Sequence, residues 1–112
     1  MNLILSAQNP TIESPVDTRF GRSQWLILVD TESKQWNAFQ NPGASQSGGA
    51  GVAAAQFVVD QKADVVISGD FGPNASRAFQ SANIEMRLFP KQALTVEEAT
   101  EFYKSGALLN YK

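Results

Sequence analysis

The segment at residues 63–75 limits the fold more than any other stretch of the chain. Its β-branched run VVI, at residues 65–67, suits a strand buried on both faces, and Gly69 and Gly72 allow the backbone to turn sharply after it. Pro73 suits the first position of a helix, where its missing N–H costs nothing. We therefore expect a strand, a glycine turn and a helix whose free N–H groups point to the carboxyl edge of the sheet, where α/β proteins bind ligands. The alternative is an ordinary strand-to-helix turn without a ligand.

The composition narrows the class of protein and the class of site. A chain of 112 residues with a hydrophobic content of 43% has the size and apolar content of one domain, which we expect to span residues 1–112. The formal net charge of −2 argues against a nucleic-acid partner. Because no apolar run approaches the roughly 18 residues that cross a bilayer, we expect no membrane association and a cytoplasmic location. The absence of cysteine and histidine excludes disulfides, thiolate or imidazole metal ligands and cysteine nucleophiles.

Residues 11–23 show no hydrophobic period and form a loop long enough to suggest a function. Its densest part, at residues 14–22, reads SPVDTRFGR. Arg19 and Arg22 offer planar, forked donors to an anionic ligand, and Phe20 can anchor the loop against the core. The alternative is that Asp17 and the two arginines are solvated or pair with each other.

A second glycine-containing segment leads into a helix. Residues 41–51 read NPGASQSGGAG and run directly into the mostly apolar helix expected at residues 52–60. Gly48, Gly49 and Gly51 allow the chain to approach another surface closely, and the helix start can present amides to negative charge. A flexible linker is the alternative explanation.

The remaining segments complete an alternating pattern. Residues 3–5, 25–30, 35–40 and 84–89 predict strands, the middle two forming a hairpin in which Trp25, Trp36 and Phe39 serve for packing. Thr95 and Glu98 form a capping box for a last helix that ends at Gly106. Residues 107–112 have no clear period, and we expect a surface extension there. The order of elements predicts a mixed α/β sheet covered by helices.

Three segments taken together, at residues 14–22, 48–51 and 69–75, resemble the dinitrogenase iron-molybdenum cofactor-binding family over nearly the whole chain. The resemblance implies a three-layer α/β/α fold of the ribonuclease-H-like type with a five-stranded mixed sheet, and it implies that the three segments meet at one end of that sheet. It also implies a non-enzymatic carrier of an iron-molybdenum cofactor, or of an iron-sulfur cluster precursor, that works with nitrogenase assembly proteins.

The resemblance and the residue chemistry assign a set of binding residues. An anionic cluster would be held by guanidinium groups and helix-start amides. The expected cofactor-binding residues are Arg19, Arg22, Gly48, Gly49, Gly51, Gly72 and Asn74. Some relatives supply cysteine or histidine near the cluster, whereas this chain has neither, so direct iron ligation falls to weaker or harder groups. The weak candidates are Asp17 and Asp70, with Glu13 and Met86 after them.

Two other functions compete with the carrier. One is a regulatory module that binds a small anion or a nucleotide through the same amides and arginines, without metal. The other is an enzyme with two-metal phosphoryl chemistry, which needs clustered carboxylates. The acidic residues Asp17, Asp30, Asp60, Asp64 and Asp70 are scattered along the sequence, so we expect no catalytic residues.

Overall fold

The computed structural model describes residues 1–46, 48–90, 94–106 and 108–110. The elements are β1 (Asn2–Ala7), β2 (Trp25–Asp30), β3 (Trp36–Gln40), α1 (Ala50–Asp60), β4 (Val65–Ser68), α2 (Pro73–Ser81), β5 (Glu85–Leu88), α3 (Val96–Lys104) and β6 (Leu109–Asn110). The expected sequence of strand, loop, hairpin, helix, strand, helix, strand and helix is confirmed.

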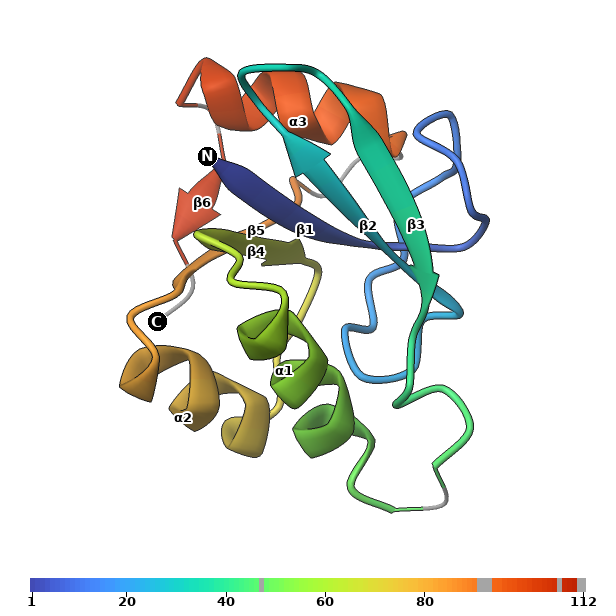
Figure 1. Cartoon of the computed structure of the whole chain (residues 1–112), viewed down its shortest axis with the longest axis vertical. Helices are drawn as coiled ribbons and strands as arrows, with labels where there is room; N and C mark the ends of the chain where they lie inside the picture. The colour runs from blue at the N-terminus through green and yellow to red at the C-terminus, as the bar shows by residue number, and fades with distance from the viewer. Residues whose placement is uncertain (47, 91–93, 107, 111–112) are drawn as a thin grey trace.

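The strands form one mixed sheet in the order β3-β2-β1-β4-β5-β6 (Figure 1). β1, β4 and β5 run parallel, with Ile4 opposite Val66 and Val66 opposite Met86. β2 is antiparallel to both β1 and β3, as the expected hairpin requires. The mixed α/β sheet of the ribonuclease-H-like type is therefore confirmed, with β6 as a two-residue addition at one edge.

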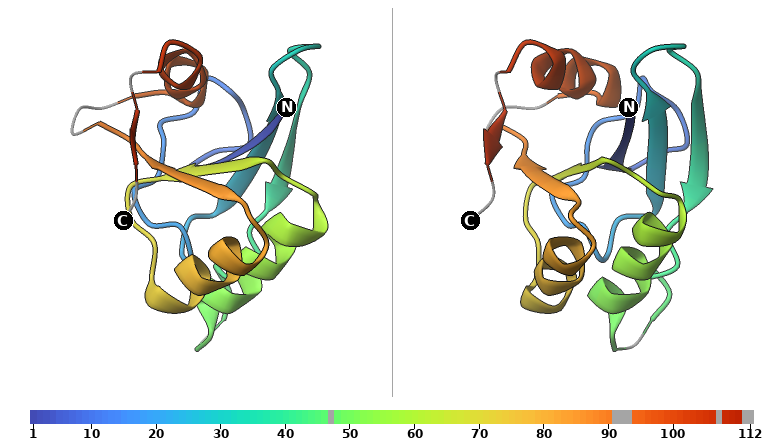
Figure 2. Two further views of the ribbon diagram at one scale, coloured as in Figure 1. Left: turned by 90° about the vertical axis from the view of Figure 1, so that its left-hand side faces the viewer. Right: turned by 60° about the vertical axis from the view of Figure 1, so that its left-hand side comes forward.

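The helices cover both faces of the sheet. α1 and α2 lie on one face and α3 lies on the other (Figures 1 and 2). Along β1, Leu3 and Leu5 pack toward α3 while Ile4 packs toward α1 and α2, and all three are fully buried. β4 repeats this alternation. A strand between two helical layers needs apolar side chains on both faces, which explains its continuous apolar run.

The helix ends follow the local sequence signals. Pro73 is the first residue of α2, as expected. The capping box of α3 is present, since Thr95 Oγ1 accepts from Glu98 N–H at 3.1 Å and Glu98 Oε1 accepts from Thr95 N–H at 2.9 Å. Gly106 follows α3 in the left-handed conformation, with φ of 77°, which suits glycine. None of the helices in the described part of the chain is long and apolar enough to span a membrane.

The expected surface extension at residues 107–112 is wrong for its central part. Leu109 pairs with Leu88 and Asn110 with Arg87, which forms β6. Arg87 Nη1 also donates to the carbonyl oxygen of Leu108 at 3.3 Å. A strand of two residues is too short to show a period, so the sequence pattern could not reveal it. Residues 107, 111 and 112 lie outside the described residues.

Candidate functional site

The candidate site lies at the edge of the sheet where β1, β3 and β4 end. Three segments leave the sheet there: the arginine loop (residues 14–22), the glycine-rich loop (residues 41–49, with residue 47 outside the described residues) and the β4–α2 turn (residues 69–72). The carboxyl edge of parallel strands is where α/β proteins commonly bind ligands.

Close backbone contacts bring the arginine loop against the β4–α2 turn and against the start of α1. A Cβ atom on Gly69 would lie 2.6 Å from the Cα of Thr18, so only glycine allows the β4–α2 turn to approach the loop this closely. A Cβ atom on Gly21 would lie 3.1 Å from the amide nitrogen of Gly51, in the first turn of α1. The loop therefore crosses from the β4–α2 turn to the start of α1.

The chain bends at Gly69, directly after β4, but this bend does not use the left-handed conformation that glycine allows. Neither Gly69 nor Gly72 has a positive φ, and Gly72 has the extended values of φ −72° and ψ 166°. The reason for glycine at position 69 is the close approach of Thr18 described above. In the glycine-rich loop, Gly49 does adopt the left-handed conformation, with φ of 72°, immediately before α1.

Phe20 anchors the arginine loop in the core, as expected. Its side chain is 2% exposed. Its ring lies 5.5 Å from the ring of Phe71 and 5.3 Å from that of Phe79, measured between centroids. Aromatic pairs in this range add to the apolar burial. The anchor fixes the backbone between Arg19 and Arg22 against α2.

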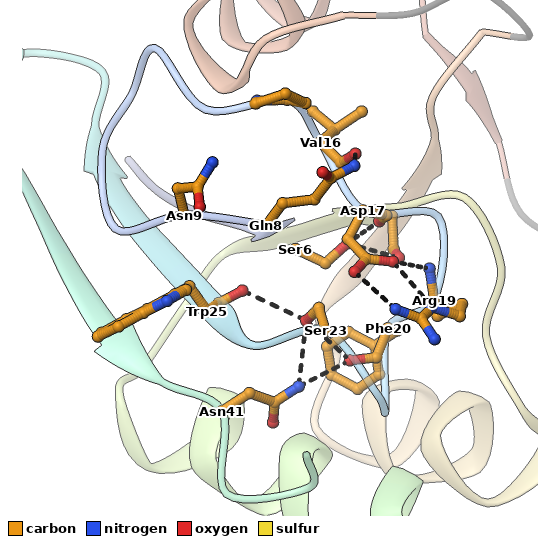
Figure 3. Close-up of polar contacts among 12 residues, drawn as sticks. Ser6, Gln8, Asn9, Val16, Asp17, Arg19, Phe20, Ser23, Trp25 and Asn41 are labelled. Atoms are coloured by element: carbon orange, nitrogen blue, oxygen red, sulfur yellow. Dashed lines mark hydrogen bonds and ion pairs between the residues drawn. The ribbon is translucent and has the colours of Figure 1, made fainter.

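Buried polar groups tie the arginine loop to the sheet. Ser6 Oγ donates to the carbonyl oxygen of Asp17 at 2.6 Å and lies 2.7 Å from Ser68 Oγ (Figure 3). Both serines are fully buried at the ends of β1 and β4. The amide of Asp17 also donates to the carbonyl oxygen of Ser6 at 2.9 Å. The backbone of Asp17 is therefore fixed from two sides.

A second polar group joins the two loops to each other. Asn41 is 3% exposed at the start of the glycine-rich loop, and its Nδ2 donates to the carbonyl oxygen of Phe20 and to Ser23 Oγ, at 3.0 and 3.1 Å. Its Oδ1 accepts from the amide of Gly43 at 3.0 Å. Since the amide of a buried asparagine needs partners on both ends, this residue determines how the two loops lie together.

Both expected arginines already have partners. Arg19 donates from Nε and Nη2 to the two carboxylate oxygens of Asp17, each at 3.2 Å (Figure 3). The hydrogen bonds and the negative charge of Asp17 raise the pKa of Arg19 above its ordinary value. Arg22 donates from Nη1 to the carbonyl oxygen of Gln46, in the glycine-rich loop. The alternative of pairing with Asp17 therefore holds for Arg19, while Arg22 joins the arginine loop to the glycine-rich loop.

The two helix starts at this site lack a counter-charge of their own. Neither α1 nor α2 has a side-chain cap or an acidic residue in its first turn, whereas α3 has its capping box with Glu97 and Glu98. Gly51 and Ala75 place these starts side by side, because a Cβ atom on Gly51 would lie 3.9 Å from the Cβ of Ala75. The first N–H groups of a helix have no acceptor within the helix and carry partial positive charge, so they suit an anion.

The remaining expected binding residues lie on the surface of this edge. Gly48, Gly49, Gly72 and Asn74 are exposed, and Gly51 is half-buried against Gly21. All of them belong to the three converging segments or to the helix starts that follow.

Arg77 is a further arginine at this edge that the sequence pattern did not single out. Its Nη2 donates to Asn74 Oδ1 at 3.4 Å and its Nε to the carbonyl oxygen of Pro73 at 3.3 Å, which brings a third arginine to the start of α2. The sequence does contain a signal for this contact. Arg77 follows Asn74 by three residues and Pro73 by four, and side chains in a helix point back toward the N-terminus, so Arg77 can reach the first turn.

The weak metal-ligand candidates do not gather. Asp17 is paired with Arg19, and the Asp70 carboxylate accepts from the amide of Phe71 at 2.9 Å. Glu13 is exposed, and Met86 packs on the core between the sheet, α1 and α2. In the described ranges, no group of three or more histidine, cysteine, aspartate or glutamate residues is placed to hold a metal ion. The residues at this edge fit an anionic group held by N–H donors, and they do not fit one held by direct ligation.

Known proteins share both the family pattern and the fold. A model of the family described as dinitrogenase iron-molybdenum cofactor matches residues 1–106. The apo form of the orange protein from Desulfovibrio gigas is 30% identical, with a TM-score of 0.91 over 98% of this chain and 92% of that chain. A NifB-like protein from Thermotoga is 25% identical, with a TM-score of 0.83 over 97% of this chain and 91% of that chain. No curated protein sequence gives a significant match.

Proposed function

The chain belongs to the dinitrogenase iron-molybdenum cofactor family, and from this membership we propose that it is a non-enzymatic carrier of an anionic metal cluster. The proposed cargo is an iron-molybdenum cofactor or an iron-sulfur precursor of it, delivered to or received from nitrogenase assembly proteins. The cargo is bound reversibly and is not changed by the protein.

One observation supports this proposal above the others. The arginine loop lies against the first turn of α1 and against the turn that precedes α2, and neither helix has a side-chain cap or an acidic residue in its first turn. Amide N–H groups at a helix start and guanidinium groups both stabilise negative charge without forming a bond to metal. A cluster held in this way keeps its own ligands, which suits a protein that has to release it.

Each proposed binding residue has its own role in holding the cluster. Arg19 and Arg22 supply positive charge and forked donors. Gly48, Gly49 and Gly51 bring no side chains to the start of α1, and Gly72 brings none just before α2, whereas Asn74 offers a polar side chain in the first turn of α2. The absence of a Cβ at the exposed glycines allows a large guest to approach the backbone closely.

The experiment is co-elution with isolated iron-molybdenum cofactor. The purified protein is mixed with the cofactor under anaerobic conditions and passed through a sizing column, and molybdenum, iron and visible absorbance are measured in the protein peak. Arg19→Ala and Arg22→Ala are run beside the wild type. The matched control is Lys104→Ala, which removes one positive charge from the last turn of α3, on the other face of the sheet.

We expect metal to co-elute with the wild type and with Lys104→Ala, and to be reduced in both arginine variants. A wild-type protein peak without metal would reject the carrier. Equal retention by the wild type and both arginine variants would reject the proposed site and leave the binding to other residues.

A regulatory module for a small anion or a nucleotide is the second candidate. It is favoured by the complete absence of cysteine and histidine, since such a ligand needs no thiolate or imidazole. A thermal-shift screen of nucleotides and oxyanions at low ionic strength tests it, because salt screens charge interactions at an exposed site. Stabilisation by a nucleotide, together with no retention of the metal cluster, would favour this candidate over the carrier.

A further inference from the structure

We infer that Asp17 determines which anions the site accepts, because its carboxylate occupies the guanidinium group that an anionic guest must take over. The inference rests on the proposed function, in that it assigns Arg19 to the guest. Asp17 then acts as an internal competitor of the ligand, and only an anion that binds Arg19 and the helix starts together displaces it.

The geometry makes Asp17 the fixed partner and Arg19 the adaptable one. The Asp17 side chain is 8% exposed, whereas that of Arg19 is 68% exposed. Asp17 is also held through its backbone by Ser6, whose hydroxyl is backed by Ser68. The long arginine side chain has several rotatable bonds and lies mostly in solvent, so it can turn toward a guest while Asp17 stays in place.

Releasing Arg19 leaves a buried carboxylate with fewer donors. Asp17 accepts three hydrogen bonds from Arg19, of which two come from the guanidinium and one, at 2.9 Å, comes from the backbone amide. When the Arg19 side chain turns away, only one of these three hydrogen bonds remains, the one from the backbone amide of Arg19. A buried charge that loses hydrogen bonds is unfavourable, so a guest must offer more than Asp17 already does.

This requirement selects a class of ligand. A singly charged small anion offers Arg19 little more than the carboxylate it already holds. A multiply charged anion with several acceptor atoms offers Arg19 more than one carboxylate does, and it has acceptors left for further N–H donors of this edge. The positive charge of Arg19 is already matched by Asp17 in an ion pair, so a weak anion gains little from this arginine.

The test removes the charge of Asp17 while keeping its shape. Asp17→Asn retains an oxygen for the backbone amide of Arg19, and Asp17→Ser, with a shorter acceptor, is the second variant in case the first one does not fold. Asp70→Asn is the matched control, since it removes one negative charge from the neighbouring turn, where the Asp70 carboxylate accepts from the amide of Phe71. Arg19→Ala and the double variant Asp17→Asn/Arg19→Ala complete a double-mutant cycle.

Inorganic phosphate is the probe, with binding followed through the backbone amide signals of residues 18–22, 48–52 and 74–76. We expect Asp17→Asn to bind phosphate about tenfold more tightly than the wild type, as expected when a charge-assisted competitor is removed. Asp70→Asn should change the dissociation constant less than about threefold, and the gain should be absent in the double variant. Thermal unfolding confirms that each variant is folded.

The opposite results overturn the inference. Phosphate binding that is unchanged or weaker in the folded charge-removal variant shows that Asp17 only supports the loop. A gain that persists without Arg19, or that Asp70→Asn equals, shows a general charge effect. Co-elution of wild-type protein with iron-molybdenum cofactor is measured separately. The carrier function can therefore be rejected while the role of Asp17 is supported, and the role of Asp17 can be rejected while the carrier function is supported.

Discussion

The side-chain amide of Asn41 donates to the carbonyl oxygen of Phe20 at 3.0 Å, although the two residues are twenty-one positions apart. Both side chains are almost completely buried, at 3% and 2% exposure. The bond joins the start of the glycine-rich loop to the aromatic anchor of the arginine loop. The arrangement of the candidate site therefore depends on a group that does not itself face a ligand.

Replacing Asn41 by alanine should separate these loops and destabilise the fold. The change leaves the amide of Gly43 without its side-chain acceptor, and it leaves the buried carbonyl of Phe20 with only the more distant hydroxyl of Ser23, at 3.4 Å. We expect the free energy of unfolding to fall by about 2 kcal/mol, measured by urea denaturation. Asn37→Ala, at an exposed position of β3, is the control and should change the stability by less than about 0.5 kcal/mol. Equal effects of the two changes would contradict the role of Asn41.

Gly69→Ala should destabilise the protein through the contact of the β4–α2 turn with the arginine loop. The added Cβ would lie 2.6 Å from both the Cα and the Cβ of Thr18 and 2.9 Å from its carbonyl oxygen, so the backbone must move. We expect a loss of about 2 kcal/mol in the free energy of unfolding. Gly48→Ala is the matched control, because its Cβ would have no atom within 4 Å. Both variants can be compared in one series of thermal and urea unfolding curves. If Gly69→Ala were as stable as the wild type, the arginine loop would have moved away from the added Cβ atom at little cost in free energy.

The order of the elements could be predicted because its signals are local, whereas the three-layer fold of the ribonuclease-H-like type was implied by the family resemblance. The strand at β4 that is buried on both faces, the hairpin, Pro73 at the start of α2 and the capping box of α3 are each indicated by residues that are neighbours in sequence. β6 escaped prediction because two residues show no period.

The candidate site could be predicted only in part, since its contacts join residues distant in sequence. The sequence indicated which segments carry the chemistry, but it did not show that Gly69 is required by Thr18 or that Arg77 reaches Asn74. Two readings of Arg19 were open from the sequence, and the geometry selects its pairing with Asp17. Which bonds an arginine makes depends on the surrounding backbone, and a pattern of residue types does not fix that.

The capping box of α3 provides a local test that is independent of the site. Thr95→Ala removes the acceptor for the amide of Glu98, and we expect the free energy of unfolding to fall by about 1 kcal/mol. Thr95→Ser keeps a hydroxyl at the same place and should restore most of this loss. Both values come from urea denaturation under one set of conditions. If the serine and alanine variants lost stability equally, the hydroxyl would not be the stabilising group.

Tyr103, in the last turns of α3, should make the stability sensitive to alkaline pH. Burial, followed by the negative charge of Glu85, raises the pKa of this phenol above its ordinary value. The proton is therefore held more tightly in the folded state than in the unfolded state, so the contribution of the neutral phenol is complete below about pH 10 and is lost as the pH rises through the folded pKa. Tyr103→Phe cannot ionise, and it should lose less stability than the wild type between about pH 9.5 and pH 12. Urea unfolding across this range measures the difference, and the phenolate absorbance of the wild type minus that of Tyr103→Phe reports the titration of Tyr103 itself. Parallel stability curves for the two proteins, or a phenol that titrates at its ordinary pH, would contradict the raised pKa.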